Sequence, residues 1–227
     1  MFTVTYLSHS GFLVETDHCY LLFDYYKGTI PPLDREKPLY VLVSHSHEDH
    51  YNKKIETLIQ QYPQVTYILS SDIEKREAPN RIYLGPDEKQ TIGLLEVETF
   101  LSTDLGIAFI VQVDGKTIYH AGDLQWWHWI GEPDQDNEDM KQMFLKEMNK
   151  LQGRHFDIAF LVLDPRQEEA FDWGFDYFLK HTDTDYAFPM HFWKDYSVID
   201  AYKYSAKAKE VKDKVMDICR EGQSFVL

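Results

Sequence analysis

Short apolar runs separated by polar turns dominate the first half of the chain. FTVTYL, GFLVET and YLLFDY lie close together, and YVLVS is apolar almost throughout, as in a buried strand. VTYILS, RIYLG, LLEVETFL, IAFIVQVDG and KTIYHAG continue the series. Within it, VQVDGKTIY predicts a hairpin, because Asp114-Gly115 suits a two-residue turn. The pattern therefore predicts a β-rich first half.

Helical patterns appear mainly in the second half. One earlier helix is predicted from about Asn52 to Gln61, where Pro63 ends it. Later helices are predicted at about Asn137 to Leu151, Glu168 to Lys180 and Val198 to Lys212. DIAFLVLD reads as another buried strand and the closing QSFVL as an edge strand. Strands first and helices later indicate two sheets covered by helices on their outer faces.

Size and composition are those of an ordinary globular protein. The chain has 227 residues, 44% hydrophobic and 27% charged, with no linker, repeat or low-complexity tract. We therefore expect a single domain over residues 1–227. Cys19 and Cys219 stand far apart in sequence, which favours a reducing, cytoplasmic setting. We recognise no signal peptide or membrane-spanning run and expect no membrane partner, while a homo-oligomer stays open.

The charge balance bears on the choice of partners. Lys and Arg number 23 and Asp and Glu 38, which gives a net charge of −15. Such a field repels phosphate backbones, so we expect no nucleic-acid partner. Bound divalent metal would offset part of this charge locally, so a nuclease is a less favoured function but is not excluded.

The candidate chemistry is concentrated directly after the apolar run YVLVS. His45, His47, Asp49 and His50 follow within six positions. Residues two apart in extended backbone project to the same side, so His45 and His47 can reach one metal ion together. Asp49 and His50 come where the chain turns and can point at a second position. Imidazole and carboxylate ligands suit Zn²⁺, and also Mn²⁺ or Fe²⁺.

HSHEDH resembles the H-x-H-x-D-H signature of the metallo-β-lactamase superfamily. The resemblance implies an α+β fold, a four-layer αββα sandwich. It also implies that Asp123, in YHAGD, bridges two metal ions and that His191, in PMHFW, binds the second. The opening SHSGFLVET is similar to the cytoplasmic lactonase-like branch, which includes ascorbate-6-phosphate lactonase.

One expected ligand is missing. The family usually supplies a third histidine to the first metal ion, but this chain has none between His50 and His120. In its place stands FLSTDLGIAF, where Asp104 is either a substitute ligand or a turn residue before Gly106. Water filling the first site is a further alternative. The second site, implied as Asp49, His50, Asp123 and His191, is complete, so we expect one or two zinc ions.

Two other histidines lie near these motifs. His120 stands close to the expected bridging Asp123, and we favour a supporting or structural role over ligation. His9, in SHSG, either faces the site from a strand turn or lies beside the ligands or at the surface.

The segment after Asp123 is rich in tryptophan. Trp126, Trp127 and Trp129 form either an aromatic wall that contacts substrate or a packing plug or oligomer contact. Arg166, in LDPRQ, either binds an anionic substrate group or makes a structural ion pair.

These residues indicate a metal-dependent hydrolase. Zinc lowers the pKa of its bound water toward about 7, and Asp49 would orient the resulting hydroxide as ligand and catalytic group. We expect a small-molecule lactone, ester, amide or phosphodiester as substrate. The alternatives are a degenerate, non-catalytic metal-binding protein and, less favoured, a nuclease. A di-iron oxidoreductase is disfavoured because its usual H-x-E-x-D-H motif has Glu where His47 stands.

Overall fold

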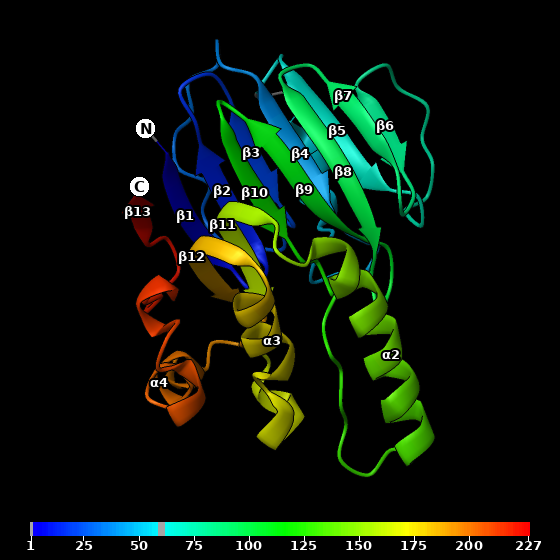
Figure 1. Cartoon of the computed structure of the whole chain (residues 1–227). Coiled ribbons are helices and arrows are strands. Elements are labelled where there is room, and N and C mark those ends of the chain that lie inside the picture. The colour runs from blue at the N-terminus through cyan, green and yellow to red at the C-terminus, as the bar shows by residue number, and fades with distance from the viewer. Residues whose placement is uncertain (1, 59–61) are drawn as a thin grey trace.

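Two β-sheets packed face to face form the centre of the molecule in a computed structural model that describes residues 2–58 and 62–227 (Figure 1). The seven-stranded sheet has the order β13-β1-β2-β3-β4-β5-β6. Its strands are β1 Thr3–Ser8, β2 Gly11–Glu15, β3 Tyr20–Phe23, β4 Leu39–Val43, β5 Val65–Ser70, β6 Arg81–Leu84 and β13 Ser224–Val226.

The six-stranded sheet has the order β12-β11-β10-β9-β8-β7. Its strands are β7 Lys89–Ile92, β8 Leu95–Leu101, β9 Ile107–Val113, β10 Lys116–His120, β11 His155–Val162 and β12 Asp183–Met190. Strands β9 and β10 form the predicted hairpin, and Asp114 and Gly115 both have positive φ, 50° and 73°. That conformation is the one a two-residue hairpin turn of this kind requires.

Parallel pairing decides where the ends of the strands lie. Strands β3 to β6 run parallel in one sheet, and β10 to β12 run parallel in the other. The carboxyl ends of parallel strands meet at one edge of a sheet, and ligand-binding loops commonly follow such ends. The expected site residues come directly after several of these strands.

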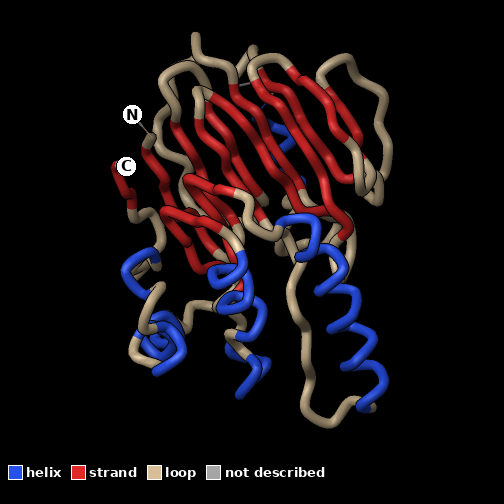
Figure 2. The backbone as a smooth tube through the Cα atoms, in the orientation of Figure 1, coloured by secondary structure: helices blue, strands red, loops and turns tan. Residues whose placement is uncertain are grey.

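Helices lie outside the sheets. They are α2 Asp134–Leu151, α3 Trp173–His181 and α4 Ser197–Lys203, with the short 3₁₀ segments η1 Lys53–Thr57, η2 Pro165–Ala170, η3 Ala206–Ala208 and η4 Lys212–Lys214. Figure 2 shows α2, α3 and α4 toward the lower end of the sheets in this view. Helix α2 buries Phe144, Met148 and Leu151, whose spacing of three to four residues places them on one face.

The core has two parts. Between the sheets, Phe160 of β11 packs against Phe12 and Phe23, with ring centroids 4.3 and 5.7 Å away. A second apolar cluster, which includes Val41, Ile55 and other buried residues, covers the opposite face of the seven-stranded sheet. The predicted α+β fold, two sheets with helices outside them, is therefore confirmed.

Several predicted helices differ from the observed ones. The helix expected from Asn52 is 3₁₀ over Lys53–Thr57, and its expected end at 59–61 lies outside the described residues. The helix expected over 168–180 begins only at Trp173, because a 3₁₀ segment ends at Ala170 and Asp172 leaves the helical conformation, with φ −116° and ψ 2°.

The last predicted helix is also shorter than expected. Helix α4 ends at Lys203, and Ser205 is already extended, with φ −69° and ψ 152°. Only short 3₁₀ turns follow. The closing segment does form an edge strand, since β13 pairs with β1 alone. Strand β7, Lys89–Ile92, is too polar to have been recognised from its apolar pattern.

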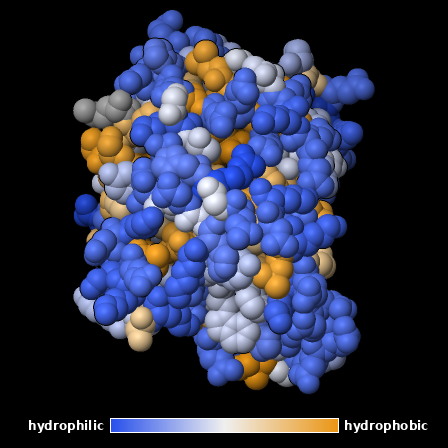
Figure 3. Space-filling model, viewed as in Figure 1, coloured by the Kyte–Doolittle hydropathy of each residue, from blue (hydrophilic) through white to orange (hydrophobic). Residues whose placement is uncertain are grey.

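The surface agrees with the acidic composition. The face in Figure 3 is largely hydrophilic, with apolar residues in small, separate patches. Among the described residues, every helix is too short or too polar to cross a bilayer.

Candidate metal centre

The candidate ligands converge where strands of both sheets end. His9 lies in the turn between β1 and β2, and the HSHEDH motif follows β4. Asp104 lies between β8 and β9, Asp123 follows β10, and His191 follows β12. One cluster therefore joins residues that are far apart in the sequence.

The side chains form two groups. We call His45, His47, Asp104 and Asp123 the His45 group, and His9, Asp49, His50 and His191 the His9 group. Within each group the potential ligand atoms all lie within 4.8 Å of one another. The two groups adjoin, because the rings of His45 and His50 are 4.1 Å apart.

Asp123 lies between the two groups. Its Oδ2 atom is 3.7 Å from Nε2 of His45, and its Oδ1 atom is 3.2 Å from Nε2 of His50. Oδ1 is also 3.5 Å from Nε2 of His191. Two atoms bound tetrahedrally to one zinc ion at about 2.0–2.2 Å lie roughly 3.4 Å apart. The two oxygens of Asp123 thus face different groups of candidate ligands.

The hydrogen bonding of these groups tests whether metal fits. The Nε2 atoms of His9, His45, His50 and His191, and Oδ1 of Asp123, are buried without a hydrogen-bond partner. Buried polar atoms are normally satisfied, and leaving one unsatisfied costs about 1–3 kcal/mol. Five such atoms clustered together fit a metal centre, since cations bound in the two groups would satisfy them.

His9 is the member of the cluster that the sequence pattern left undecided. Its side chain is only 4% exposed, and its Nε2 atom lies 3.3 Å from Oδ2 of Asp49. Burial lowers the pKa of His9 to about 4, although the adjacent Asp49 carboxylate opposes this shift. The imidazole is therefore neutral at pH 7, the form that binds metal. Its backbone φ of 56° is unusual for a non-glycine residue.

Asp104 occupies the place of the missing histidine. Its Oδ2 atom lies 3.3 Å from Nδ1 of His47. Thr103 ties this loop to the next strand end, because its hydroxyl donates to the carbonyl oxygens of Asp123 and Gln125 at 3.1 and 2.7 Å. Burial and the nearby charge of Asp123 raise the pKa of Asp104. A cation between the two carboxylates would relieve this repulsion.

Two glycines let the loops approach this closely. A Cβ atom on Gly106 would lie 2.1 Å from the carbonyl oxygen of Ser44, and one on Gly122 would lie 2.7 Å from Cβ of Ser44. Both glycines have positive φ, 71° and 52°. The loops that carry Asp104 and Asp123 therefore pack directly on the backbone that begins the HSHEDH motif.

Two buried carboxylates orient candidate histidine ligands by contacting Nδ1, the ring nitrogen that does not face the centre. Oδ2 of Asp24 lies 2.7 Å from Nδ1 of His50, and Oδ2 of Asp164 lies 2.9 Å from Nδ1 of His191. Such contacts fix the ring orientation and leave Nε2 free to bind metal. The sequence reasoning missed both residues. Asp24 directly follows β3 and Asp164 comes two residues after the end of β11, and a carboxylate at the end of an apolar run was the available signal.

His120 has the supporting role that was favoured from the sequence. Its Nε2 atom lies 3.0 Å from the carbonyl oxygen of Ser10, and its Nδ1 atom accepts a hydrogen bond from the Gly122 backbone N–H at 3.1 Å. Its ring stacks on Phe23 at 5.0 Å. Both nitrogens are in use, so His120 supports the strand end rather than the metal.

The three tryptophans divide between two roles. Trp127 is buried, donates from Nε1 to the carbonyl oxygen of Asp123 and lies 5.7 Å from the ring of His191. Trp129 stacks on it at 5.7 Å. Both belong to a wall beside the metal centre.

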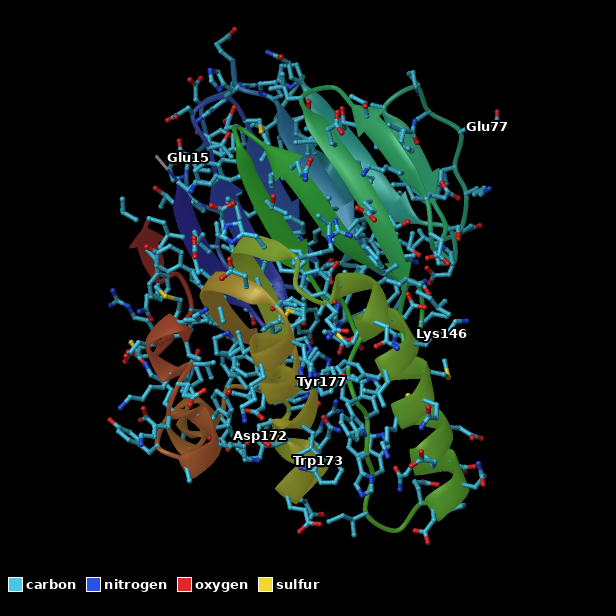
Figure 4. All side chains as sticks on the ribbon, viewed as in Figure 1. Glu15, Glu77, Lys146, Asp172, Trp173 and Tyr177 are labelled. Atoms are coloured by element: carbon cyan, nitrogen blue, oxygen red, sulfur yellow. The ribbon has the colours of Figure 1, made fainter. Side chains whose placement is uncertain are left out.

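Trp126 does not belong to that wall and has the other role considered from the sequence, that of a packing residue. It packs against Phe144 of α2 and against Trp173 and Tyr177 of α3. The two α3 residues are labelled in Figure 4. Neighbouring residues in this loop point to different sides, so one indole fills the space between the helices while the next two face the centre.

Arg166 makes an ion pair and also borders the wall. Its guanidinium donates to Asp164 through Nε and Nη2, which was the structural alternative. It also lies over the ring of Trp129 in the wall, 5.7 Å from the ring centroid, and over the ring of Trp193, 4.6 Å from the centroid. Because Asp164 contacts His191, the position of Arg166 is coupled to that of a candidate ligand.

Exposure shows from which side a substrate reaches the centre. The side chains of His47, Asp104 and Asp49 are 49%, 45% and 26% exposed. His45 and His50 are fully buried. The centre is therefore closed from behind and open on the side of His47 and Asp104.

Comparison with known proteins gives a consistent family. Residues 3–128 match the model of the family described as Beta-lactamase superfamily domain. A UPF0173 metal-dependent hydrolase of Heliobacterium modesticaldum is 28% identical over 143 residues, 54% of this chain. The match spans 60% of that protein's length.

Another relative and one solved structure match over almost their full length. The UPF0173 metal-dependent hydrolase of Nanoarchaeum equitans is 27% identical over 91% of this chain and 92% of its own. Igni18, titled a novel metallo hydrolase from the archaeon Ignicoccus hospitalis, superposes with a TM-score of 0.69. At 17% identity over 100% and 99% of the two chains, that likeness concerns the fold alone.

Proposed function

This chain belongs to the metallo-β-lactamase superfamily, and from that premise we propose that it is a zinc-dependent hydrolase of small molecules. The observation that carries the proposal is the set of buried, unpartnered imidazole nitrogens around Asp123. Family relatives are named metal-dependent hydrolases, which supports the reaction class.

Two ions are proposed, one for each group of ligands. The His45 group supplies two imidazoles and two carboxylates, and the His9 group supplies three imidazoles and one carboxylate. Asp123 also faces the His9 group through Oδ1. Imidazole with carboxylate suits zinc, with Mn²⁺ or Fe²⁺ as alternatives. Asp104 thus stands in the His45 group where the family usually has a histidine, and His9 adds a third imidazole to the His9 group.

The chemistry divides between the ions and the chain. Zinc, when bound, polarises the substrate oxygen and lowers the pKa of water to about 7. Asp49 is ionised, because His9, His50 and His191 lower its pKa despite the opposing effect of burial. Its carboxylate is partly exposed and accepts the hydrogen bond that orients the attacking water. Trp127 and Trp129 limit the access of bulk water on one side.

The proposed substrate is a lactone, ester, amide or phosphodiester of a small molecule. The net charge of −15 disfavours a polyanionic polymer, and the aromatic wall suits a partly apolar ligand. A cytoplasmic setting and a lactonase-like activity both belong to this proposal.

The test combines metal analysis with a panel of hydrolase substrates. We expect two equivalents of zinc per chain by mass spectrometry and zinc-dependent hydrolysis of at least one small ester or lactone. His9→Ala should lose one equivalent. His18→Ala is the matched control, because His18 is 69% exposed and pairs with Asp114 away from the centre.

The outcomes separate the alternatives. Two equivalents of zinc without hydrolysis of any substrate in the panel would favour the non-catalytic metal-binding alternative. A His9→Ala variant that keeps both equivalents would remove His9 from the ligand set.

A further inference from the structure

A small pocket adjoins the metal centre on the side of His9. Its volume is about 100 Å³, and its walls are Ser8, His9, Tyr26, Lys27, Trp193 and Lys194. Two of these six residues are lysines and none is a carboxylate. In a chain with 38 acidic and 23 basic residues, that composition is unusual.

The volume sets the size of the group that the pocket can hold. One water molecule occupies about 30 Å³ in the liquid, so the pocket has room for roughly three. A carboxylate or a phosphate group is of this size, whereas a sugar or an aromatic ring is larger. The pocket therefore suits one substituent of a substrate.

The charged side chains in the pocket wall favour the binding of an anion. Lys27 has no ion-pair partner among the residues that the structure describes, and its ammonium group lies 4.4 Å from the centroid of the Tyr26 ring. Nζ of Lys194 lies 3.3 Å from Oε1 of Glu221, and the hydroxyl of Ser8 donates a hydrogen bond to the same oxygen. An ammonium group has three donors, so Lys194 keeps donors for a further anion.

The backbone around the pocket is held in an uncommon conformation. His9, Trp193 and Lys194 have positive φ values of 56°, 49° and 67°. Non-glycine residues adopt this region rarely, and such strain gathers where a structure must aim particular side chains. The strained turns are joined, since the His191 backbone N–H donates to the carbonyl oxygen of His9 at 3.3 Å.

The pocket and the metal centre share a wall. His9 belongs to both, and the ring of Trp193 lies 4.4 Å from the ring of His9 and 5.7 Å from that of His191. The pocket that holds the two lysines therefore lies directly beside the His9 group.

We propose that this pocket binds an anionic group, a carboxylate or a phosphate, of the substrate whose neutral end is hydrolysed at the metal centre. The inference rests on the proposed hydrolase function and narrows its substrate to small anionic esters or lactones. Lys27 and Lys194 hold the charge, and Trp193 separates it from the metal ligands.

The experiment compares zinc-loaded wild type with the double variant Lys27→Met, Lys194→Met. Para-nitrophenyl acetate and mono-para-nitrophenyl succinate share a leaving group but differ in charge. We expect kcat/KM for the succinate ester to fall roughly tenfold in the variant, as for loss of charge-assisted hydrogen bonds. Hydrolysis of the neutral acetate ester and zinc content should stay unchanged.

A binding measurement keeps the pocket testable without turnover. Titration of the same zinc-loaded proteins with phenylphosphonate and with succinate compares phosphate-like and carboxylate chemistry. Both should bind more weakly to the double variant, and the stronger binder identifies the group. The control variant Lys146→Met, Lys209→Met removes two exposed lysines, one of which, Lys146, lies on α2 (Figure 4).

The outcomes distinguish the two proposals. Anion binding that depends on Lys27 and Lys194 without ester hydrolysis would contradict the hydrolase proposal but keep the pocket. Equal binding to wild type and double variant, or equal loss of activity on both esters, would overturn the pocket proposal.

Discussion

The carboxylate of Asp24 lies 2.7 Å from Nδ1 of His50, and both side chains are fully buried. The contact directs Nε2 of His50 toward Asp123. Asp24 also accepts hydrogen bonds from the backbone N–H and the hydroxyl of Ser44, so it fixes the start of the HSHEDH motif as well.

Asp24→Asn should weaken zinc binding by about 10- to 100-fold, the usual effect of removing a partner that orients a metal-bound histidine. Calorimetric titration of the metal-free variant with zinc measures this change. Asp164→Asn tests the equivalent contact at His191. Unchanged zinc affinity in both variants would mean that packing alone orients the two rings.

Asp104→Ala should reduce the zinc content from two equivalents to one, because the His45 group would keep only one carboxylate and two imidazoles. The remaining ion should bind as tightly as the tighter of the two in wild type. Asp104→His should restore the second equivalent by supplying the histidine that other family members have. Mass spectrometry of the three desalted proteins gives the stoichiometry. Two ions in Asp104→Ala would exclude Asp104 as a ligand.

Gly106→Ala should destabilise the protein by more than the cost of positive φ alone, which is about 1–2 kcal/mol. The added methyl group would meet the carbonyl oxygen of Ser44 at 2.1 Å. Gly115→Ala is the matched control, since Gly115 has nearly the same φ, 73°, but open space around its Cβ position. Urea unfolding of both variants isolates the effect of the close approach. Equal losses of stability would show that the loop moves away without penalty.

Removing metal should lower the melting temperature markedly. At free zinc a thousandfold above the dissociation constant, binding stabilises the native state by about 4 kcal/mol. For a chain of this size that corresponds to about 8–16 °C. Differential scanning calorimetry with and without a chelator measures the shift, and added zinc should reverse it whereas added calcium should not. A melting temperature that is indifferent to chelation would contradict the two-ion centre.

The sequence could predict much of the fold because apolar periodicity and turn residues act locally. The β9–β10 hairpin follows from Asp114-Gly115, and β4 follows from YVLVS. The residues at which the helices end were harder to predict than the strands. Helix α4 stops at Lys203 because the next segment turns back to the sheet, where Met216 N–H donates to the carbonyl oxygen of Ala187. That tertiary contact has no local signal.

In the candidate site too, the residues of a local motif could be predicted, whereas those placed by tertiary contacts could not. His45, His47, Asp49 and His50 form a compact motif that can be read directly. His9 could not be assigned, because its closeness to His191 depends on which strands of the two sheets lie opposite each other. The role of Trp126 could not be decided for a similar reason, since contacts with residues of α2 and α3 determine where its ring points.

The position of His191 in the chain has a consequence for the order of folding. His191 follows β12, the strand at the edge of the six-stranded sheet beside β11, and its ring lies 4.1 Å from that of His9. Contacts between residues so distant in sequence form only after a large loop has closed. A chain emerging from the ribosome therefore has the HSHEDH motif long before it can complete the His9 group. Full-affinity uptake of the ion in that group should coincide with the docking of β12, which makes metal binding a late step in folding.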